Sequence, residues 1–81
     1  MDQTLSKPEV MSDLDTVLFA NPNGTFYVAY AFDPSTGSWK RYQDITDAEV
    51  RSWLRSNGRS DDYIDRKIAG ALAALAERNR R

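Results

Sequence analysis

Residues 16–43 read TVLFANPNGTFYVAYAFDPSTGSWKRYQ, and this stretch decides the fold. Three runs rich in β-branched and aromatic residues are separated by two loops, 21–24 and 34–37, each of which contains proline and glycine. Proline fixes φ early in each loop, and glycine adopts the left-handed conformation that closes a turn. The pattern predicts three strands joined as an antiparallel meander.

The loop lengths set the register of the two hairpins, and the register decides which side chains share a face. With four residues in each loop, Phe19 lies opposite Phe26, and one face collects most of the large apolar side chains. The members of this face are Val17, Phe19, Phe26, Val28, Tyr30, Phe32 and Trp39. The other face carries Leu18, Ala20, Tyr27, Ala29, Ala31, Lys40 and Tyr42. A one-residue bulge in the second hairpin is the alternative, and it exchanges Trp39 and Tyr42 between the faces.

Beyond residue 43 the apolar residues follow a helical spacing. Thr46 and Glu49 match a capping box, which indicates that a helix begins there. This helix is expected to end at Gly58, and a second helix is expected to begin after Ser60 and to run to about Arg78. Three strands followed by two helices predict an α+β domain of order βββαα, with both helices packed on the aromatic face of the three-stranded sheet.

Gly70 lies inside the second predicted helix, where glycine costs about 1 kcal/mol relative to alanine. Two interpretations stay open at this point. Either Gly70 marks the close approach of another backbone, from the first helix or from a second subunit, or it is a tolerated surface substitution.

The chain has 81 residues and a mass of 9.2 kDa, which is the size of one domain. Residues 1–14 are polar and lack periodicity, so we predict a flexible N-terminal tail over 1–14 and a single α+β domain over 15–81. The composition, 41% hydrophobic and 28% charged, is typical of a soluble protein. Because no apolar run has the length of a bilayer and no secretory signal opens the chain, we expect a cytoplasmic protein without a membrane partner.

The sequence contains neither cysteine nor histidine. This excludes disulfides, thiolate zinc sites, imidazole bases and imidazole metal ligands. The acidic residues near 44–49 and 61–65 precede or open predicted helices, where capping and the helix dipole account for them. No calcium-binding loop and no glycine-rich phosphate loop is present. We therefore expect no enzyme activity, no catalytic residues, no cofactor and no metal.

We expect a small protein–protein interaction module, such as an adaptor, an inhibitor or a regulatory subunit. In the predicted register, only the N-terminal tail over 1–14 is long enough to cover the second face of the sheet. If the tail does not fold back over it, the face is exposed apolar surface with aromatic residues, which is typical of interfaces. The basic stripe of the first helix is the other candidate surface. The protein-binding residues expected from these two surfaces are Leu18, Tyr27, Ala29, Tyr42, Arg51 and Arg55. The expected partner is another protein, and self-association as a homodimer is left open.

The alternative is a nucleic-acid-binding domain. Residues 39–81 carry ten basic and seven acidic side chains, whereas residues 1–38 carry one basic and five acidic. Basic side chains gathered in this way can contact phosphates. The candidate residues are Lys40, Arg41, Arg51, Arg55, Arg59, Arg78, Arg80 and Arg81.

Over less than half of the chain, the topology resembles the small arm-type DNA-binding domains at the N-termini of phage integrases. The residues that carry the resemblance are in 24–28, 33–37 and 48–54. The resemblance implies a three-stranded sheet followed by a helix, with basic side chains on the exposed sheet face meeting DNA. This chain has Tyr27, Ala29 and Ala31 at the matching positions, and only Lys40 is basic there.

Overall fold

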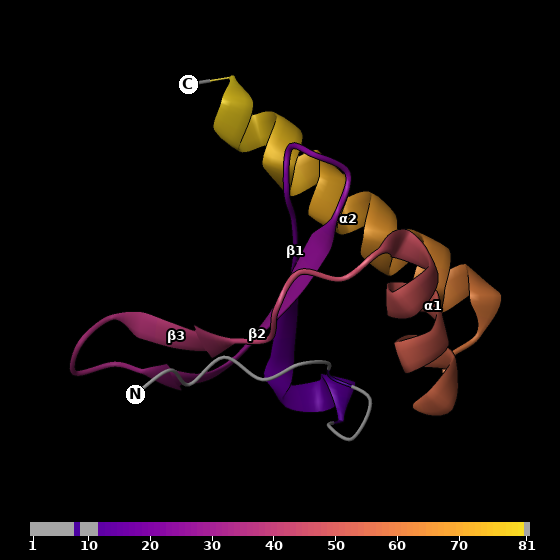
Figure 1. Ribbon diagram of the computed structural model, residues 1–81, viewed down its shortest axis with the longest axis horizontal. Coiled ribbons are helices and arrows are strands. Elements are labelled where there is room, and N and C mark those ends of the chain that lie inside the picture. The colour runs from indigo at the N-terminus through magenta and orange to yellow at the C-terminus, as the bar shows by residue number, and fades with distance from the viewer. Residues whose placement is uncertain (1–7, 9–11, 81) are drawn as a thin grey trace.

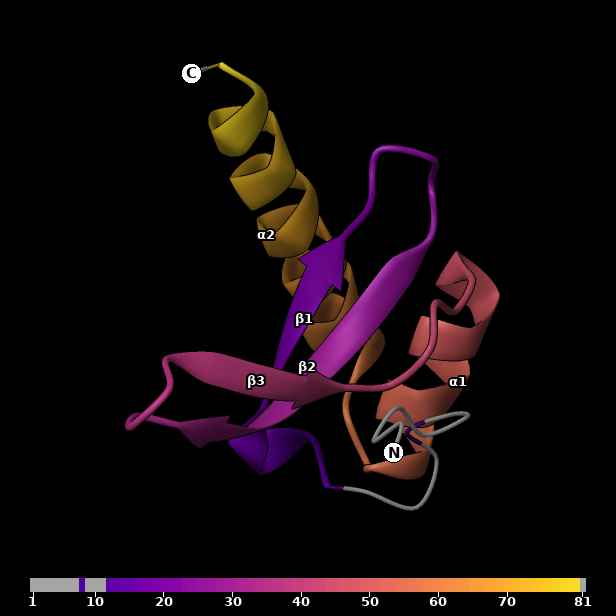
Figure 2. The ribbon, with the colours of Figure 1, turned by 60° about the vertical axis from the view of Figure 1, so that its left-hand side comes forward.

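The computed structural model describes residues 8 and 12–80 and shows one antiparallel sheet followed by two helices (Figure 1). The elements in chain order are the 3-10 turn η1 (Asp13–Asp15), the strands β1 (Thr16–Ala20), β2 (Phe26–Asp33) and β3 (Ser38–Arg41), and the helices α1 (Asp47–Ser56) and α2 (Asp61–Asn79). The strand order in the sheet is β1-β2-β3, so the predicted α+β fold of order βββαα is confirmed. The β2–β3 hairpin projects away from both helices (Figure 2).

The register of the first hairpin differs from the prediction by one residue. Ala20, rather than Phe19, lies opposite Phe26. The loop has five residues because Asn23 Oδ1 accepts hydrogen bonds from both the N–H and the hydroxyl of Thr25, at 3.1 and 2.6 Å, and holds Thr25 in the turn. A shift of one residue turns every side chain of a strand to the other face. The predicted faces of β1 are therefore wrong.

The second hairpin contains the bulge that was the alternative. Asp33 pairs with Ser38 as predicted, but Tyr30 pairs with Lys40, and the register changes between Tyr30 and Asp33. Ala31 takes up the extra residue at φ +51°, a left-handed conformation that is uncommon for alanine. The bulge places Tyr42 in the core with 1% of its surface exposed and leaves Trp39 with 44% exposed.

The core joins one face of the sheet to both helices. Its buried members are Leu18, Ala20, Phe26, Val28, Tyr30, Tyr42, Ile45, Val50, Trp53, Leu54, Ile64, Ile68 and Ala71. Among the side chains predicted for the core face, Phe26, Val28 and Tyr30 are confirmed. The members that lie outside the core are Val17, Phe19, Phe32 and Trp39, because of the two register changes. The chain after β3 is held along β2 by two hydrogen bonds between Phe26 and Ile45, of 2.7 and 2.8 Å, and this pairing sets the start of α1.

The helix ends follow the sequence signals. Thr46 Oγ1 accepts from the Glu49 N–H at 3.2 Å, and Glu49 Oε1 accepts from the Thr46 N–H at 3.0 Å, which completes the predicted capping box. Gly58 takes φ +79° after α1, and Ser60 caps α2 by accepting from the Tyr63 N–H at 3.2 Å. These local contacts fix the turn that aligns α2 with the sheet.

Most of the predicted tail over 1–14 lies outside the described residues. Its last residues, 12–14, lead into η1, where Ser12 Oγ accepts from the Leu14 N–H at 3.2 Å. The Asp13 N–H donates to Asn57 Oδ1 at 3.3 Å, so this turn is joined to the end of α1. The folded part of the chain therefore includes Asp13, ahead of the boundary expected at residue 15.

Candidate functional site

The sheet face predicted to bind protein does not form an exposed patch. Leu18, Ala29 and Tyr42 are buried, and Tyr27 is half-buried. The Tyr27 ring stacks on Phe19 with the centroids 5.1 Å apart, and the Arg41 guanidinium carbon lies 3.8 Å from the Tyr27 centroid. The one-residue register shift in β1 and the bulge between β2 and β3 account for this correction, because they turn Leu18 and Tyr42 into the core.

The arginine stripe of α1 is paired with carboxylates of the same chain. Arg51 donates to Asp47 at 2.7 Å and to Asp65 at 2.8 Å, and these two hydrogen bonds raise the pKa of Arg51. Arg55 lies 3.5 Å from Asp61. Because α2 supplies two of these acids, the stripe contributes to the packing of one helix beside the other.

The remaining predicted phosphate contacts are scattered over the molecule. Arg41 forms an ion pair with Asp44, and Arg80 lies 3.5 Å from Glu77. Lys40 is exposed on β3. Two further members of the set are Arg78, whose Nη2 donates to the Ala20 carbonyl oxygen at 3.1 Å, and Arg81, which lies outside the described residues. The structure therefore does not bring the predicted cations together as one basic surface.

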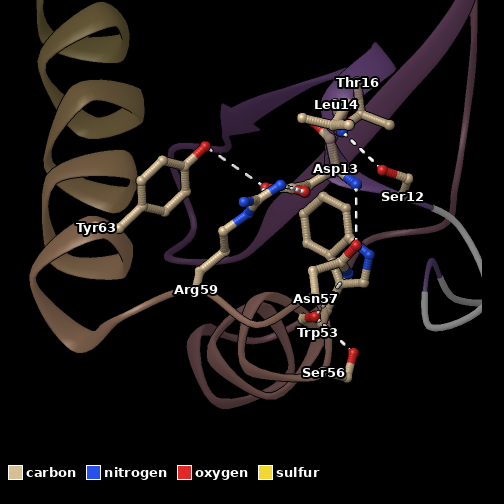
Figure 3. Close-up of polar contacts among 9 residues, drawn as sticks. All are labelled: Ser12, Asp13, Leu14, Thr16, Trp53, Ser56, Asn57, Arg59 and Tyr63. Carbon is tan, nitrogen blue, oxygen red and sulfur yellow. Dashed lines mark hydrogen bonds and ion pairs between the residues drawn. The ribbon is translucent and has the colours of Figure 1, made fainter.

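Arg59, whose side chain is partly exposed, forms an ion pair with the buried carboxylate of Asp13, and no sequence pattern predicts this pair (Figure 3). Arg59 Nη2 and Nε donate to the two carboxylate oxygens of Asp13 at 2.7 and 2.9 Å, and the Asp13 side chain has 0% of its surface exposed. The Tyr63 hydroxyl lies 3.5 Å from the same carboxylate. The two residues are 46 positions apart, so no local pattern could have joined them.

We expect part of the acid sensitivity of the fold to come from Asp13. The hydrogen bond from Arg59 lowers the pKa of Asp13 below its ordinary value of 3.8, despite the opposing effect of burial. A carboxylate with a lowered folded-state pKa contributes stability above its unfolded-state pKa, and that contribution is lost as the pH falls through the folded-state pKa. The loss therefore occurs below about pH 4.

Urea unfolding at about pH 7 and about pH 3 checks this expectation. Asp13→Asn should be less stable than the wild type at neutral pH and should lose less stability on acidification. The control is Asp33→Asn. Hydrogen bonds from Ser35 also lower the pKa of Asp33, but this carboxylate lies on the exposed hairpin. The pH dependence of stability should therefore change less in Asp33→Asn than in Asp13→Asn. An Asp13→Asn variant with the pH dependence of the wild type would contradict the assignment.

The outer edge of β1 pairs with no other strand of the described chain, although its core-facing residues Leu18 and Ala20 are buried. Phe26 and Val28 direct their peptide groups away from β1, since Phe26 pairs with Ile45 and the Val28 carbonyl accepts from the Tyr42 N–H at 2.9 Å. In an antiparallel pair, the opposite residues then direct their own peptide groups outward. Leu18 and Ala20 are these residues. Arg78 Nη2 donates a hydrogen bond to the Ala20 carbonyl oxygen. Among residues 12–80, none forms a hydrogen bond with the N–H or the carbonyl oxygen of Leu18.

A cleft of about 420 Å³ separates this edge from α2. The helix runs beside β1 in both views of the ribbon (Figures 1 and 2). The lining residues are Thr16, Val17, Leu18 and Phe19 from β1 and Arg66, Lys67, Gly70, Ala71 and Ala74 from α2. A Cβ atom placed on Gly70 would have no neighbouring atom within 4 Å, so α1 does not make the close backbone approach that was one of the two interpretations of Gly70. Within this chain, an exposed position with open space agrees with the other interpretation, a tolerated surface substitution. We call this cleft the β1–α2 groove.

Sequence reasoning missed the groove as a site. One signal was available, namely Gly70 inside a helix otherwise rich in alanine.

Within the described part of the chain, no three acidic side chains gather into a group that could hold a metal ion. Neither described helix has the length and apolar character needed to cross a membrane. Comparison with protein-family models, curated proteins and solved structures finds no match to this chain.

Proposed function

We propose that this chain is a non-enzymatic protein-interaction module that binds an extended segment of a partner protein along the edge of β1. The observation that carries the proposal is the edge of β1, which has no strand partner in the described chain and borders the β1–α2 groove. In strand addition, main-chain hydrogen bonds supply affinity, and pockets beside the edge supply specificity.

The two edges of the sheet differ in their suitability for strand addition. Edge strands are usually protected by charged residues, proline or short length. β3 has four residues, including Lys40 and Arg41, and β1 reads TVLFA without charge or proline. This contrast favours β1 as the edge that receives a strand.

The open space at Gly70 supports the same proposal. A strand that pairs with β1 brings its own backbone into the groove, beside α2. Glycine leaves more room there than any other residue, which gives a reason for a helix-interior glycine that costs about 1 kcal/mol. In this proposal the approaching backbone belongs to the partner.

The nucleic-acid alternative draws less support from the geometry. Arg51, Arg55 and Arg59 each face a carboxylate of this chain, and binding phosphate there would compete with those pairs. No partner, compartment or activity is assigned by any relative. The protein-binding function and the cytoplasmic location stay predictions, and the groove is the surface on which the first is tested.

Selection from a displayed library of random peptides tests the proposed function. The wild type should enrich a common set of extended peptides, and Gly70→Phe should weaken the binding of those peptides at least about tenfold, because the ring occupies the groove. Helix stability is not the cause of such a loss, since phenylalanine is a better helix former than glycine. Ala69→Phe is the matched control, because Ala69 is the exposed neighbour outside the groove lining.

Two results would count against the proposed function. One is a selection that enriches no peptide. The other is a set of peptides that bind Gly70→Phe and the wild type equally well, since their site would then lie outside the groove.

A further inference from the structure

We infer that the segment bound in the β1–α2 groove is acidic, with carboxylates flanking an apolar centre. This inference rests on the proposed function and adds the chemistry of the partner. It is argued from the charges that remain uncompensated around the groove.

The groove has a positive lining. Among the described residues that line it, Arg66 and Lys67 are cationic and none is acidic. Arg66 is exposed, and no ion pair joins it to a carboxylate among the residues whose side chains the structure describes. Lys67 is half-buried; its Nζ lies 5.9 Å from the centroid of the Tyr63 ring, and its charge acts on the Asp13 carboxylate. Most of the arginines elsewhere in the range 12–80 are paired with a carboxylate, as in the α1 stripe. Arg66 is therefore the lining cation that is available to a ligand.

A third cation, Arg78, lies farther along α2. Arg78 lies near the end of α2, where its Nη2 donates to the Ala20 carbonyl and its Cζ lies 5.9 Å from the centroid of the Phe19 ring. Arg78 is twelve positions after Arg66 in α2, which corresponds to a rise of about 18 Å along the helix. An extended chain covers that length with about five or six residues, at about 3.3 Å each. A short strand can therefore meet a cation at each end.

The middle of the groove is apolar and has little side-chain bulk on the helix side. Gly70, Ala71 and Ala74 provide that side, and Leu18 and Phe19 face it from β1. Because the Ala20 carbonyl oxygen already accepts a hydrogen bond from Arg78, the added strand would form its main-chain hydrogen bonds with the N–H and carbonyl oxygen of Leu18. The occupant that matches this surface is a β-branched or small apolar stretch with acidic residues toward its ends.

Two capped peptides test the inference directly. One has a valine-rich centre flanked by glutamates, and the other has the same centre flanked by lysines. We expect the glutamate peptide to bind the wild type more tightly, with an affinity that falls as salt is added. Arg66→Glu should weaken the glutamate peptide about three- to tenfold and strengthen the lysine peptide. Lys40→Glu makes the same charge change on exposed β3, outside the groove, and should alter neither affinity appreciably.

The outcomes separate this inference from the proposed function. Equal binding of the two peptides, both weakened by Gly70→Phe, overturns the acidic inference and leaves the groove as a binding site. Binding of neither peptide, together with a failed library selection, overturns both. Arg66-dependent binding of a single-stranded oligonucleotide in preference to the glutamate peptide overturns the inference in favour of nucleic acid. Dimerisation of the wild type that Gly70→Phe abolishes, and that excludes the glutamate peptide, overturns it in favour of a second copy of the chain.

Discussion

Trp53→Ala is expected to abolish the cooperative fold, whereas Trp39→Ala leaves it intact. Trp53 is buried at the centre of the core with 1% of its surface exposed. Truncating a large aromatic side chain in a core costs about 3–5 kcal/mol, and a domain of this size has a net stability of about 5 kcal/mol or slightly more. The variant therefore lies near or below the limit of folding. Near-ultraviolet circular dichroism and a thermal melt measure the loss.

The Trp39 variant is the matched control and also tests the register. Trp39 is largely exposed on the projecting hairpin, where its ring centroid lies 4.9 Å from that of Phe32. Its removal should change the melting temperature by only a few degrees. If Trp39→Ala were the more damaging substitution, the second hairpin would lack the bulge, and Trp39 would lie in the core as the four-residue loops predict.

Arg59→Ala is expected to lower the melting temperature by at least about 10 °C. The substitution removes the bidentate partner of the fully buried Asp13 carboxylate and leaves near it the Tyr63 hydroxyl, at 3.5 Å, and the charge of Lys67. Removing one member of a buried ion pair is strongly destabilising because the other member stays buried without compensation. Thermal melts of the variants measure the effect.

Two variants make this expectation specific to the buried pair. Arg55→Ala removes an exposed arginine whose Nε lies 3.5 Å from Asp61, and it should change the melting temperature little. Combining Arg59→Ala with Asp13→Ala should restore part of the stability, since the unpaired carboxylate is then absent. A melting temperature for Arg59→Ala equal to that of Arg55→Ala would show that η1 is not held to the turn between α1 and α2 by this pair.

The local signals in the sequence predicted the elements well. Thr46 and Glu49 make the capping box through contacts within one turn, so their spacing alone was sufficient. The order βββαα followed from such signals. The register did not, because it depends on whether Thr25 belongs to the loop or to β2. The hydrogen bonds from Thr25 to Asn23 decide that question and add one residue to the turn.

The faces of the sheet could not be predicted for the same reason. Ala31 adopts a positive φ, which sequence preference does not favour for alanine, and the resulting bulge turns Tyr42 inward. The candidate site also depends on long-range packing. The β1–α2 groove exists because α2 lies beside β1, and α2 is placed by the core and by the pair of Arg59 with Asp13. Gly70 was the one local sign of that surface.

Amide hydrogen exchange at Leu18, measured by nuclear magnetic resonance with and without a peptide selected on the wild type, tests strand addition most directly. The Leu18 N–H points to the open edge of β1, whereas Val17 and Phe19 direct their peptide groups toward β2. The account predicts that the bound peptide slows exchange at Leu18 and that Gly70→Phe removes the effect. Unchanged exchange at Leu18 with the peptide bound would contradict the claim that β1 receives a strand.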